Sequence, residues 1–295
     1  MTTLDVPSEP PTIPLSIQEV GSNKHKIYVI VKDELAKADR LIRLLCSLEV
    51  GLSLPQSFRG IHTSRIQERI FGVSSSPHDS LLDFSAVLAK EIYQSQPCES
   101  SFVELSAEYP YETVFPETHL ANMQSFTLLC KTTFDGQDLT RSVGMVASIV
   151  MACPCSQRYY AQMFSGKDSE SRTSSLASLL THTQRGSLRI AVENLSSTLP
   201  FKQLLEIMEE TAVLPYWMLK RPEEISLIMR SLQNAQFVED LVRAAARNAS
   251  KRIKNEDKDA AIIDARVVSF ESIHPFNLFA HIRLPVREIM RISGL

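Results

Sequence analysis

The sequence has 295 residues, of which 44% are hydrophobic and 22% are charged, and its formal net charge is -3. A chain of this length can bury an ordinary core and form two modest domains or one large domain. The small negative charge and the lack of a basic cluster argue against a nucleic-acid partner. No apolar stretch approaches the roughly 20 residues that cross a bilayer, so we expect no membrane association.

Cysteine usage and the first residues indicate the compartment. Five cysteines, an odd number, in a chain of this length do not resemble a disulfide framework. Residues 1–14 carry acids and four prolines rather than a basic segment followed by an apolar one, so we expect neither a signal peptide nor an anchor. We therefore expect a cytoplasmic protein with thiols free for metal binding or catalysis.

In the first half of the chain, the pattern predicts mainly strands. Residues 1–14 have little to bury and are expected to form a flexible tail. An apolar face through residues 80–93 predicts a helix, a shorter helix is expected after residues 59–65, and Asp135-Gly136 predicts a hairpin turn. Runs rich in β-branched and apolar residues predict strands, at residues 26–32, 41–54, 101–109, 124–133 and 142–152.

The second half mixes helices and strands. The serine-rich residues 165–175 are expected to form a loop, and a helix from about Lys202 should end or kink at Pro215. A second long helix is expected from about residue 223 to 253, interrupted near residues 233–234. Strands are predicted at residues 187–192, 262–270 and 278–284, and the last of them closes the chain. This order predicts an α+β fold in which each half pairs an antiparallel sheet with helices on one face.

Two polar motifs lie at the ends of predicted strands. Cys153 ends a strand and begins Cys-Pro-Cys, and a partly exposed thiolate there suits zinc or ferrous iron. A buried cysteine acting as a small apolar residue is equally consistent. His182, Gln184 and Arg185 come just before the next strand, where the arginine suits phosphate oxygens. A loop whose polar groups face water is the alternative.

Four further residues are candidates for metal binding or proton transfer. Glu271 and His274 follow the strand at residues 262–270 and could converge on one ion, although a surface ion pair is the alternative. Glu224 and Glu239 lie on the long predicted helix, and their spacing puts them about 60° from a common face. Solvated helix acids are the alternative for both.

Six segments, taken in order, resemble those of the bacterial type IB GTP cyclohydrolases and the related archaeal GTP cyclohydrolase IV. They are residues 60–65 (Gly-Ile-His-Thr-Ser-Arg), 153–156 (Cys-Pro-Cys-Ser), 182–185 (His-Thr-Gln-Arg), 219–224 (Leu-Lys-Arg-Pro-Glu-Glu), 234–240 (Asn-Ala-Gln-Phe-Val-Glu-Asp) and 271–274 (Glu-Ser-Ile-His). Each segment is weak alone, but six in order with compatible spacing are specific. One position departs from the family: its second histidine, two residues after the last motif, is here Phe276.

The resemblance implies two tunnelling-fold modules in tandem, residues 15–150 and 151–295, the second carrying most of the metal-site residues. It also implies a homodimer or homotetramer that binds GTP between subunits, and a divalent metal, Fe(II) or alternatively Mn or Zn. The implied metal ligands are Cys153, Glu224, Glu271 and His274. The implied catalytic residues are His182 and Glu239, and the implied substrate contacts are Glu239, His62, Ser64, Arg65 and Arg185.

The implied reaction is hydrolytic opening of the GTP imidazole ring at C8, with release of formate, for pterin biosynthesis of the tetrahydromethanopterin or folate type. Residues 11–23 and the long segment between Cys155 and His182 look more like the archaeal type, which gives 7,8-dihydroneopterin 2',3'-cyclic phosphate. The bacterial type, which gives 7,8-dihydroneopterin triphosphate, is the alternative. Phe276 keeps open a non-catalytic purine- or pterin-binding protein. A tunnelling-fold enzyme that uses Cys153 covalently is the third hypothesis.

Overall fold

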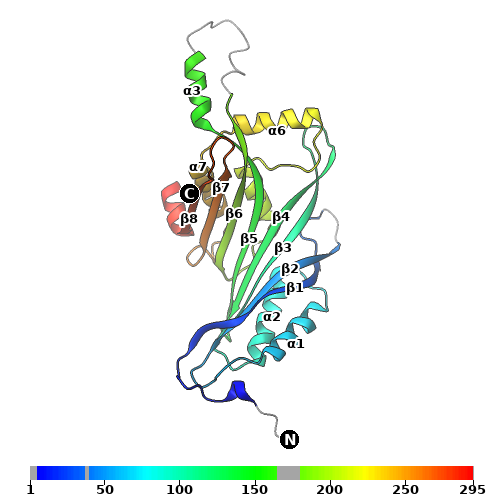
Figure 1. Ribbon diagram of the computed structural model, residues 1–295, viewed down its shortest axis with the longest axis vertical. Helices are drawn as coiled ribbons and strands as arrows, with labels where there is room; N and C mark the ends of the chain where they lie inside the picture. The colour runs from blue at the N-terminus through cyan, green and yellow to red at the C-terminus, as the bar shows by residue number, and fades with distance from the viewer. Residues whose placement is uncertain (1–4, 37–39, 165–179, 295) are drawn as a thin grey trace. The chain divides into compact units, whose positions relative to one another are not determined.

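Eight antiparallel strands, arranged in one sheet in the order of the sequence, form the framework of the protein (Figure 1). The computed structural model describes residues 5–36, 40–164 and 180–294, so the predicted loop at residues 165–175 lies outside the described residues. The strands are β1 (Ile17–Lys32), β2 (Leu41–Leu54), β3 (Ser101–Val114), β4 (Ala121–Phe134), β5 (Leu139–Ala152), β6 (Thr183–Leu195), β7 (Ile262–Phe270) and β8 (Leu278–Pro285). Every predicted strand is therefore present, and most are longer than predicted.

Burial alternates along the strands, as expected for a sheet with one covered face. In β7 the side chains of Ile263, Ala265 and Val267 are fully buried, while the residues between them are partly or fully exposed. Because side chains in a strand point alternately to the two faces, one face of β7 supplies the core. No described helix is long and apolar enough to span a bilayer.

The chain forms two compact units, each assembled from several segments. Unit 1 contains Met1–Tyr109, Thr127–Val143 and Glu193–Pro200, and unit 2 contains Pro110–Phe126, Gly144–Val192 and Phe201–Leu295. Both units draw on residues before and after position 150. The expected division into residues 15–150 and 151–295 stays a prediction.

In unit 1, two helices cover β1 and β2. Helices α1 (Thr63–Ser74) and α2 (Leu81–Ser95) pack on each other and on these strands. Ser80 caps α2, because its Oγ accepts a hydrogen bond of 2.9 Å from the Asp83 N–H. The predicted hairpin turn joins β4 to β5: the Asp135 carboxylate accepts hydrogen bonds from the backbone N–H groups of residues 137 and 138. Gly136 in this turn has φ of +95°, which favours glycine.

In unit 2, the described α-helices are α3 (Pro154–Phe164), α5 (Phe201–Thr211), α6 (Arg221–Gln233), α7 (Val238–Ser250) and α8 (Val286–Ser293). The helix expected near Lys202 ends at Thr211, before Pro215, and the predicted interruption of the long helix is confirmed at residues 234–237. Helix α7 packs on α5, α8, β7 and β8.

Two short helices were not expected from the sequence. A helix, α3, follows Cys153 where a polar loop was expected, and α8 follows the strand that was expected to close the chain. Helix α8 buries only Val286 and Ile289, and it ends at Gly294, whose φ of +67° forms a left-handed cap. Because eight residues give little more than two turns, the apolar period is too short to stand out in the sequence.

One charged cluster ties three strands of unit 2 together. The Asp264 carboxylate on β7 accepts a hydrogen bond of 2.6 Å from Arg189 Nη1 on β6. Its other oxygen lies 2.7 Å from Nε2 of His281 on β8. Burial raises the pKa of Asp264, but the bonds with Arg189 and His281 outweigh it and hold that pKa below its usual value.

Candidate functional site

Three of the predicted site residues lie at the ends of neighbouring strands in unit 2. Cys153 follows β5, His182 precedes β6 and Glu271 follows β7. The Cys153 N–H donates to the His182 carbonyl oxygen at 3.3 Å, and Thr181 Oγ1 donates to the Cys153 carbonyl oxygen at 2.8 Å. The backbones of Cys153 and His182 are therefore held side by side where β5 ends and β6 begins.

Gln184 connects the histidine to the carboxylate. Its Oε1 lies 3.0 Å from His182 Nδ1, and its Nε2 donates to Ser269 Oγ at 3.2 Å and more weakly to Glu271 Oε1 at 3.4 Å. Ser269 Oγ in turn donates to Glu271 Oε1 at 2.6 Å. We call these residues, Cys153, His182, Gln184, Ser269 and Glu271, the strand-end network.

The network determines which nitrogen of His182 carries the proton. The side-chain nitrogen of Gln184 faces two oxygens, so its Oε1 must be the atom that faces His182 Nδ1. An acceptor at this position favours a proton on Nδ1, and Ser272 Oγ, 3.2 Å from the same nitrogen, can accept from it as well. In the neutral imidazole, Nε2 then keeps a lone pair that can take a proton from a substrate or from water.

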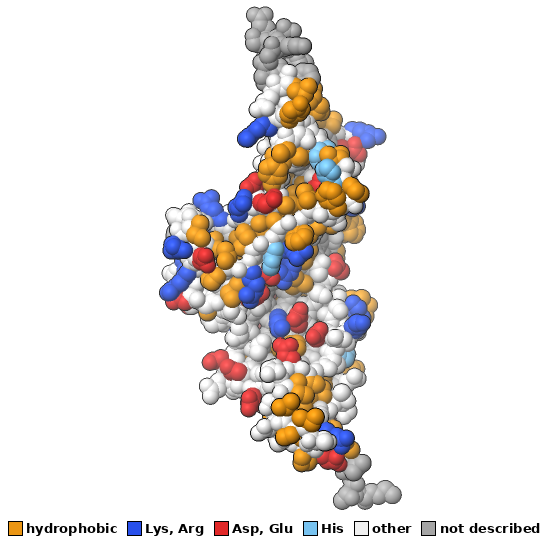
Figure 2. All heavy atoms as spheres, turned by 60° about the vertical axis from the view of Figure 1, so that its left-hand side comes forward, with side chains coloured by type: hydrophobic (Ala, Val, Ile, Leu, Met, Phe, Trp, Pro, Cys, Tyr) orange, Lys and Arg blue, Asp and Glu red, His pale blue; other side chains and the backbone are white. Residues whose placement is uncertain are grey.

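His274 and Phe276 lie on the exposed segment between β7 and β8. Their rings stack in parallel, with centroids 5.1 Å apart and planes inclined by 8°. Figure 2 shows hydrophobic side chains gathered beside histidine side chains on one exposed face of the protein, and Ile273, Phe276 and Phe279 are each more than half exposed. The residue that departs from the family pattern is therefore a direct neighbour of a predicted metal ligand.

Glu224 and Glu239 do not share a helix, which corrects the expectation of a nearly common face. Glu224 lies in the first turn of α6 and Glu239 in the first turn of α7, because residues 234–237 separate the two helices. The Glu224 carboxylate accepts a 2.7 Å hydrogen bond from Arg221, and Glu239 is exposed. The buried carboxylate of this region is Glu223, whose pKa is lowered by a hydrogen bond with Thr118.

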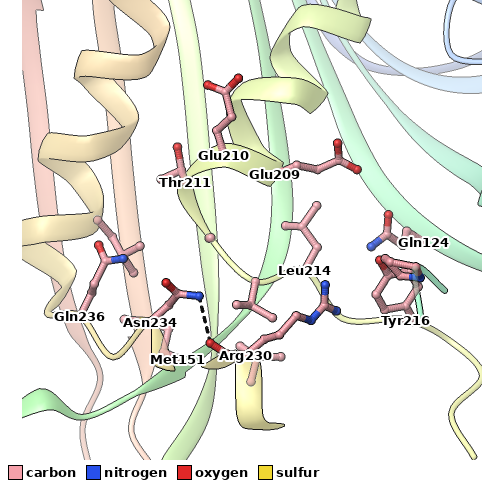
Figure 3. A pocket seen from close by; sticks show the side chains of 15 residues that line it. Gln124, Met151, Glu209, Glu210, Thr211, Leu214, Tyr216, Arg230, Asn234 and Gln236 are labelled. Carbon is pink, nitrogen blue, oxygen red and sulfur yellow. Dashed lines mark hydrogen bonds between the residues drawn. The ribbon is translucent and has the colours of Figure 1, made fainter. Parts of the chain in front are cut away.

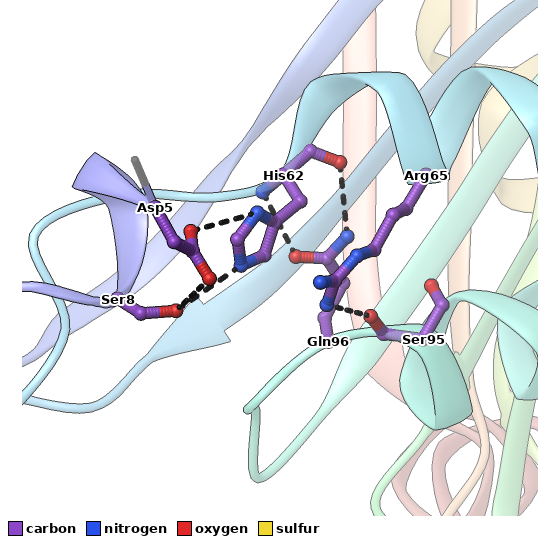
Figure 4. Close-up of polar contacts among 6 residues, drawn as sticks. All are labelled: Asp5, Ser8, His62, Arg65, Ser95 and Gln96. Atoms are coloured by element: carbon purple, nitrogen blue, oxygen red, sulfur yellow. Dashed lines mark hydrogen bonds and ion pairs between the residues drawn. The ribbon is translucent and has the colours of Figure 1, made fainter. Parts of the chain in front are cut away.

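His62, a predicted substrate contact, is held in unit 1 by the N-terminal segment (Figure 4). Its Nδ1 lies 3.6 Å from Asp5 Oδ1, and its Nε2 lies 3.4 Å from Ser8 Oγ. Gln96 holds the backbone of His62 through two reciprocal hydrogen bonds of 3.1 and 3.0 Å. The imidazole is thus fixed by polar groups on both sides.

The remaining predicted phosphate contacts are exposed. Ser64 and Arg65 begin α1, where Arg65 Nη1 lies 3.5 Å from the carbonyl oxygen of Ser95 (Figure 4). Arg185 lies near the start of β6, next to Gln184 in sequence. These arginines are placed to meet a ligand from solvent, and their roles stay predictions.

The predicted ligands suit a divalent ion by their chemistry. A thiolate, an imidazole and carboxylates together favour a borderline metal such as Fe(II) or Zn(II). Within residues 5–36, 40–164 and 180–294 of one chain, however, no three His, Cys, Asp or Glu side chains are grouped to hold a metal. The complete ligand set, Cys153, Glu224, Glu271 and His274, therefore stays a prediction.

Gln184 was named in the sequence only as part of a polar motif, without a role in the site, and Ser269 and Ser272 were not named at all. Ser272 Oγ lies 3.2 Å from His182 Nδ1, beside the Gln184 contact. A signal for Gln184 existed: it is two residues from His182 at the start of a strand, and such residues point to the same face. The serines show no comparable signal, because their contacts depend on how β6 and β7 pair.

Comparisons with known proteins point to one family and one fold. A family model described as type I GTP cyclohydrolase folE2 matches residues 4–280. GTP cyclohydrolase FolE2 of Thermosipho melanesiensis is 28% identical over 97% of this chain and 99% of that protein. GTP cyclohydrolase MptA of Thermoplasma volcanium is 27% identical over 95% and 94%, and MptA of Methanocaldococcus jannaschii is 26% identical over 97% and 96%.

Two solved structures show the same fold at low sequence identity. Uricase from Arthrobacter globiformis superposes with a TM-score of 0.54 at 6% identity, covering 91% of this chain and 93% of that chain. A hyper-thermostable AgUricase mutant gives a TM-score of 0.55 at 7% identity, covering 92% of both chains. These likenesses, together with the antiparallel sheet, identify a tunnelling fold, as expected from the sequence.

Proposed function

Because this chain belongs to the type I GTP cyclohydrolase FolE2 family, whose members are hydrolases, we propose that it opens the imidazole ring of GTP at C8 and releases formate. The strand-end network is the observation that supports this most directly, because it brings a thiol, an imidazole and a carboxylate to one end of the sheet. The product would enter pterin biosynthesis of the tetrahydromethanopterin or folate type.

In the proposed reaction, His182 moves protons. Its Nε2 takes a proton from the water that adds to C8, while Gln184 accepts the hydrogen bond from Nδ1–H and holds the ring. The imidazolium then returns the proton to the ring nitrogen that leaves C8. A second hydrolysis of the resulting formamide releases formate. Glu239 is the proposed anchor for the purine edge, and Arg185, His62, Ser64 and Arg65 are the proposed phosphate contacts.

We propose Cys153, Glu224, Glu271 and His274 as the residues that hold a divalent metal, Fe(II) with Mn or Zn as alternatives. When bound, such an ion would act as a Lewis acid toward the attacking water. The four residues are not grouped in the described part of one chain. A homodimer or homotetramer, with residues from two subunits completing each site, would resolve this, and the exposed segment with His274 is the part of the site available to a second subunit.

For the product we propose 7,8-dihydroneopterin 2',3'-cyclic phosphate, the archaeal type, with the triphosphate as the alternative. The relatives do not decide between them, because FolE2 and MptA proteins are 28% and 27% identical to this chain. The product type is therefore a question for mass spectrometry.

The test is an anaerobic assay of purified protein with GTP and Fe(II), Mn(II) or Zn(II). Formate is measured enzymatically, and the pterin is identified by mass spectrometry. Cys153→Ala should abolish formate release and lower the bound metal measured by elemental analysis, while Cys155→Ala, at an exposed cysteine two residues away, should change neither. No formate with any metal would overturn the proposal. GTP binding without formate would instead support the non-catalytic role that Phe276 keeps open.

A further inference from the structure

A cavity of about 460 Å³ lies in unit 2 and contains none of the residues of the strand-end network (Figure 3). Its walls come from the end of α5 and the residues after it, from α6 and α7, and from β4 and β5. This volume falls within the range of about 300–1,000 Å³ that is common for small-molecule sites. The proposed function assigns it no role.

Arg230 of α6 contributes the unusual feature of this cavity. Its Nε and Nη2 atoms are buried and have no hydrogen-bond partner among the residues that the structure describes. The nearest carboxylate oxygen paired with it, Glu117 Oε1, lies 3.9 Å from Nε, beyond hydrogen-bond distance, and accepts a 2.8 Å hydrogen bond from Ser226 Oγ instead. Charged donors left without a hydrogen-bond acceptor in a buried place are costly, so this arrangement suits a ligand that supplies the missing acceptor.

The two free nitrogens define the shape of that acceptor. Nε and Nη2 lie on the same edge of the guanidinium, and their N–H groups point in parallel, as in bidentate pairs with carboxylates. Figure 3 shows the Arg230 guanidinium pointing toward Tyr216 and Gln124. Burial raises the pKa of Tyr216, and the positive charge of the nearby Arg230 only partly offsets this, so the phenol stays a neutral neighbour.

Other groups in the cavity limit the charge of the ligand. Glu209 and Glu210 also line it. The Glu210 carboxylate is paired with Arg252, so Glu209 is the group that would repel a ligand with several negative charges. Burial and the neighbouring Glu206 raise the pKa of Glu209, which reduces but does not remove that repulsion. Apolar surface from Met151 and Leu214 is available to the uncharged part of a ligand.

We propose that this cavity binds a small organic monocarboxylate, held by two parallel hydrogen bonds from Arg230 Nε and Nη2. The site is independent of the proposed cyclohydrolase reaction, so it can be tested without turnover.

Benzoate is the probe, with neutral benzamide as its matched control, and binding is measured by calorimetry and thermal melting of the full chain. Benzoate should bind and raise the Tm, and benzamide should do neither. Arg230→Lys keeps the charge but loses the parallel donors, so we expect about tenfold weaker binding, and Arg230→Met should abolish it. Arg243→Lys alters an exposed arginine on α7 that pairs with Asp240, and it should bind benzoate like the wild type.

Equal binding of benzoate to the wild type and to Arg230→Lys would overturn the proposal, as would no binding at all. Tighter binding of inorganic phosphate than of benzoate would overturn the carboxylate class. Displacement of benzoate by GTP would overturn the independence of the site from the substrate. If Arg230→Met does not fold, the Nε–Hε resonance of Arg230, assigned by its loss in Arg230→Lys, should shift with benzoate. Glu117→Gln removes the carboxylate charge nearest to Arg230 Nε. An Nε–Hε resonance that does not shift with benzoate in either the wild type or Glu117→Gln would refute the site.

Discussion

Replacing Gln184 with leucine tests whether the strand-end network positions the catalytic histidine. Leucine has a similar volume but neither accepts a hydrogen bond from His182 Nδ1 nor donates to Ser269 and Glu271. The contacts with His182 and Ser269 are 3.0 and 3.2 Å, and the weaker one with Glu271 is 3.4 Å. Without the amide oxygen, the proton on the ring of His182 is free to move to Nε2, the atom that must accept a proton in the proposed reaction.

The size of the effect follows from the two shorter contacts, with His182 and Ser269. A neutral hydrogen bond contributes about 0.5–1.5 kcal/mol net, so the loss of both amounts to about 1–3 kcal/mol. At about 1.4 kcal/mol for each factor of ten, kcat should fall about 5- to 140-fold, in line with the effect of residues that orient metal ligands. Because Gln184 is proposed to touch other side chains rather than the substrate, KM should change much less than kcat.

The assay is formate release under anaerobic conditions, with kcat and KM determined separately for wild type and Gln184→Leu. Gln233→Leu, at an exposed glutamine that ends α6, is the control and should match the wild type. A Gln184→Leu protein with unchanged kcat would refute the positioning role. A rise in KM with unchanged kcat would show instead that Gln184 contacts the substrate.

Three further predictions concern stability and the exposed segment. Asp264→Asn should lower the free energy of unfolding at neutral pH by about 1.5–3 kcal/mol, because the carboxylate loses charged hydrogen bonds. Since the pKa of Asp264 is lowered in the folded state, that stability is present above about pH 4 and is lost as pH falls through the lowered pKa. The free energies of unfolding of the two proteins, measured in urea, should therefore converge in acid. A difference that stays constant with pH would contradict this. Gly136→Ala should destabilise by about 1–3 kcal/mol in thermal melting, because its φ is +95° and the new Cβ would meet the hydroxyl of Tyr93; an unchanged Tm would refute the strain. Phe276→Ala should leave the Tm nearly unchanged but lower metal content or kcat up to about tenfold through the lost stacking on His274, and unchanged values of both would show that the stack has no function.

Local patterns were sufficient for most of the fold. The Asp135-Gly136 turn, the strand at residues 41–54 and the strand at residues 262–270 follow from period and turn chemistry alone. Strand β1 begins at Ile17 rather than at residue 26. Residues 17–25 have no apolar run that would predict a strand, but they pair with β2 across two register irregularities. That pairing is a tertiary effect that propensity does not contain.

The candidate site was predictable only in part. Motifs identified Cys153, His182 and Glu271, and the adjacency of β5, β6 and β7 brings them to one end of the sheet. Glu224 and Glu239 were expected near a common face because a continuous helix was assumed. A four-residue break between α6 and α7 places them on separate helices. The absence of hydrogen-bond acceptors at Nε and Nη2 of Arg230 among the described residues could not be predicted, because it depends on how distant segments pack around the guanidinium.

The backbone bond between Cys153 and His182 has a consequence for how chains of this kind can vary. The two residues are 29 positions apart in sequence (182 minus 153), yet this bond holds their backbones together where β5 ends and β6 begins. Each doubling of the length of a flexible segment between two such residues costs only about 0.6 kcal/mol of closure entropy, so we expect this backbone bond to tolerate changes in that length. Insertions there are a natural route by which related chains could diversify while keeping the same reactive pair.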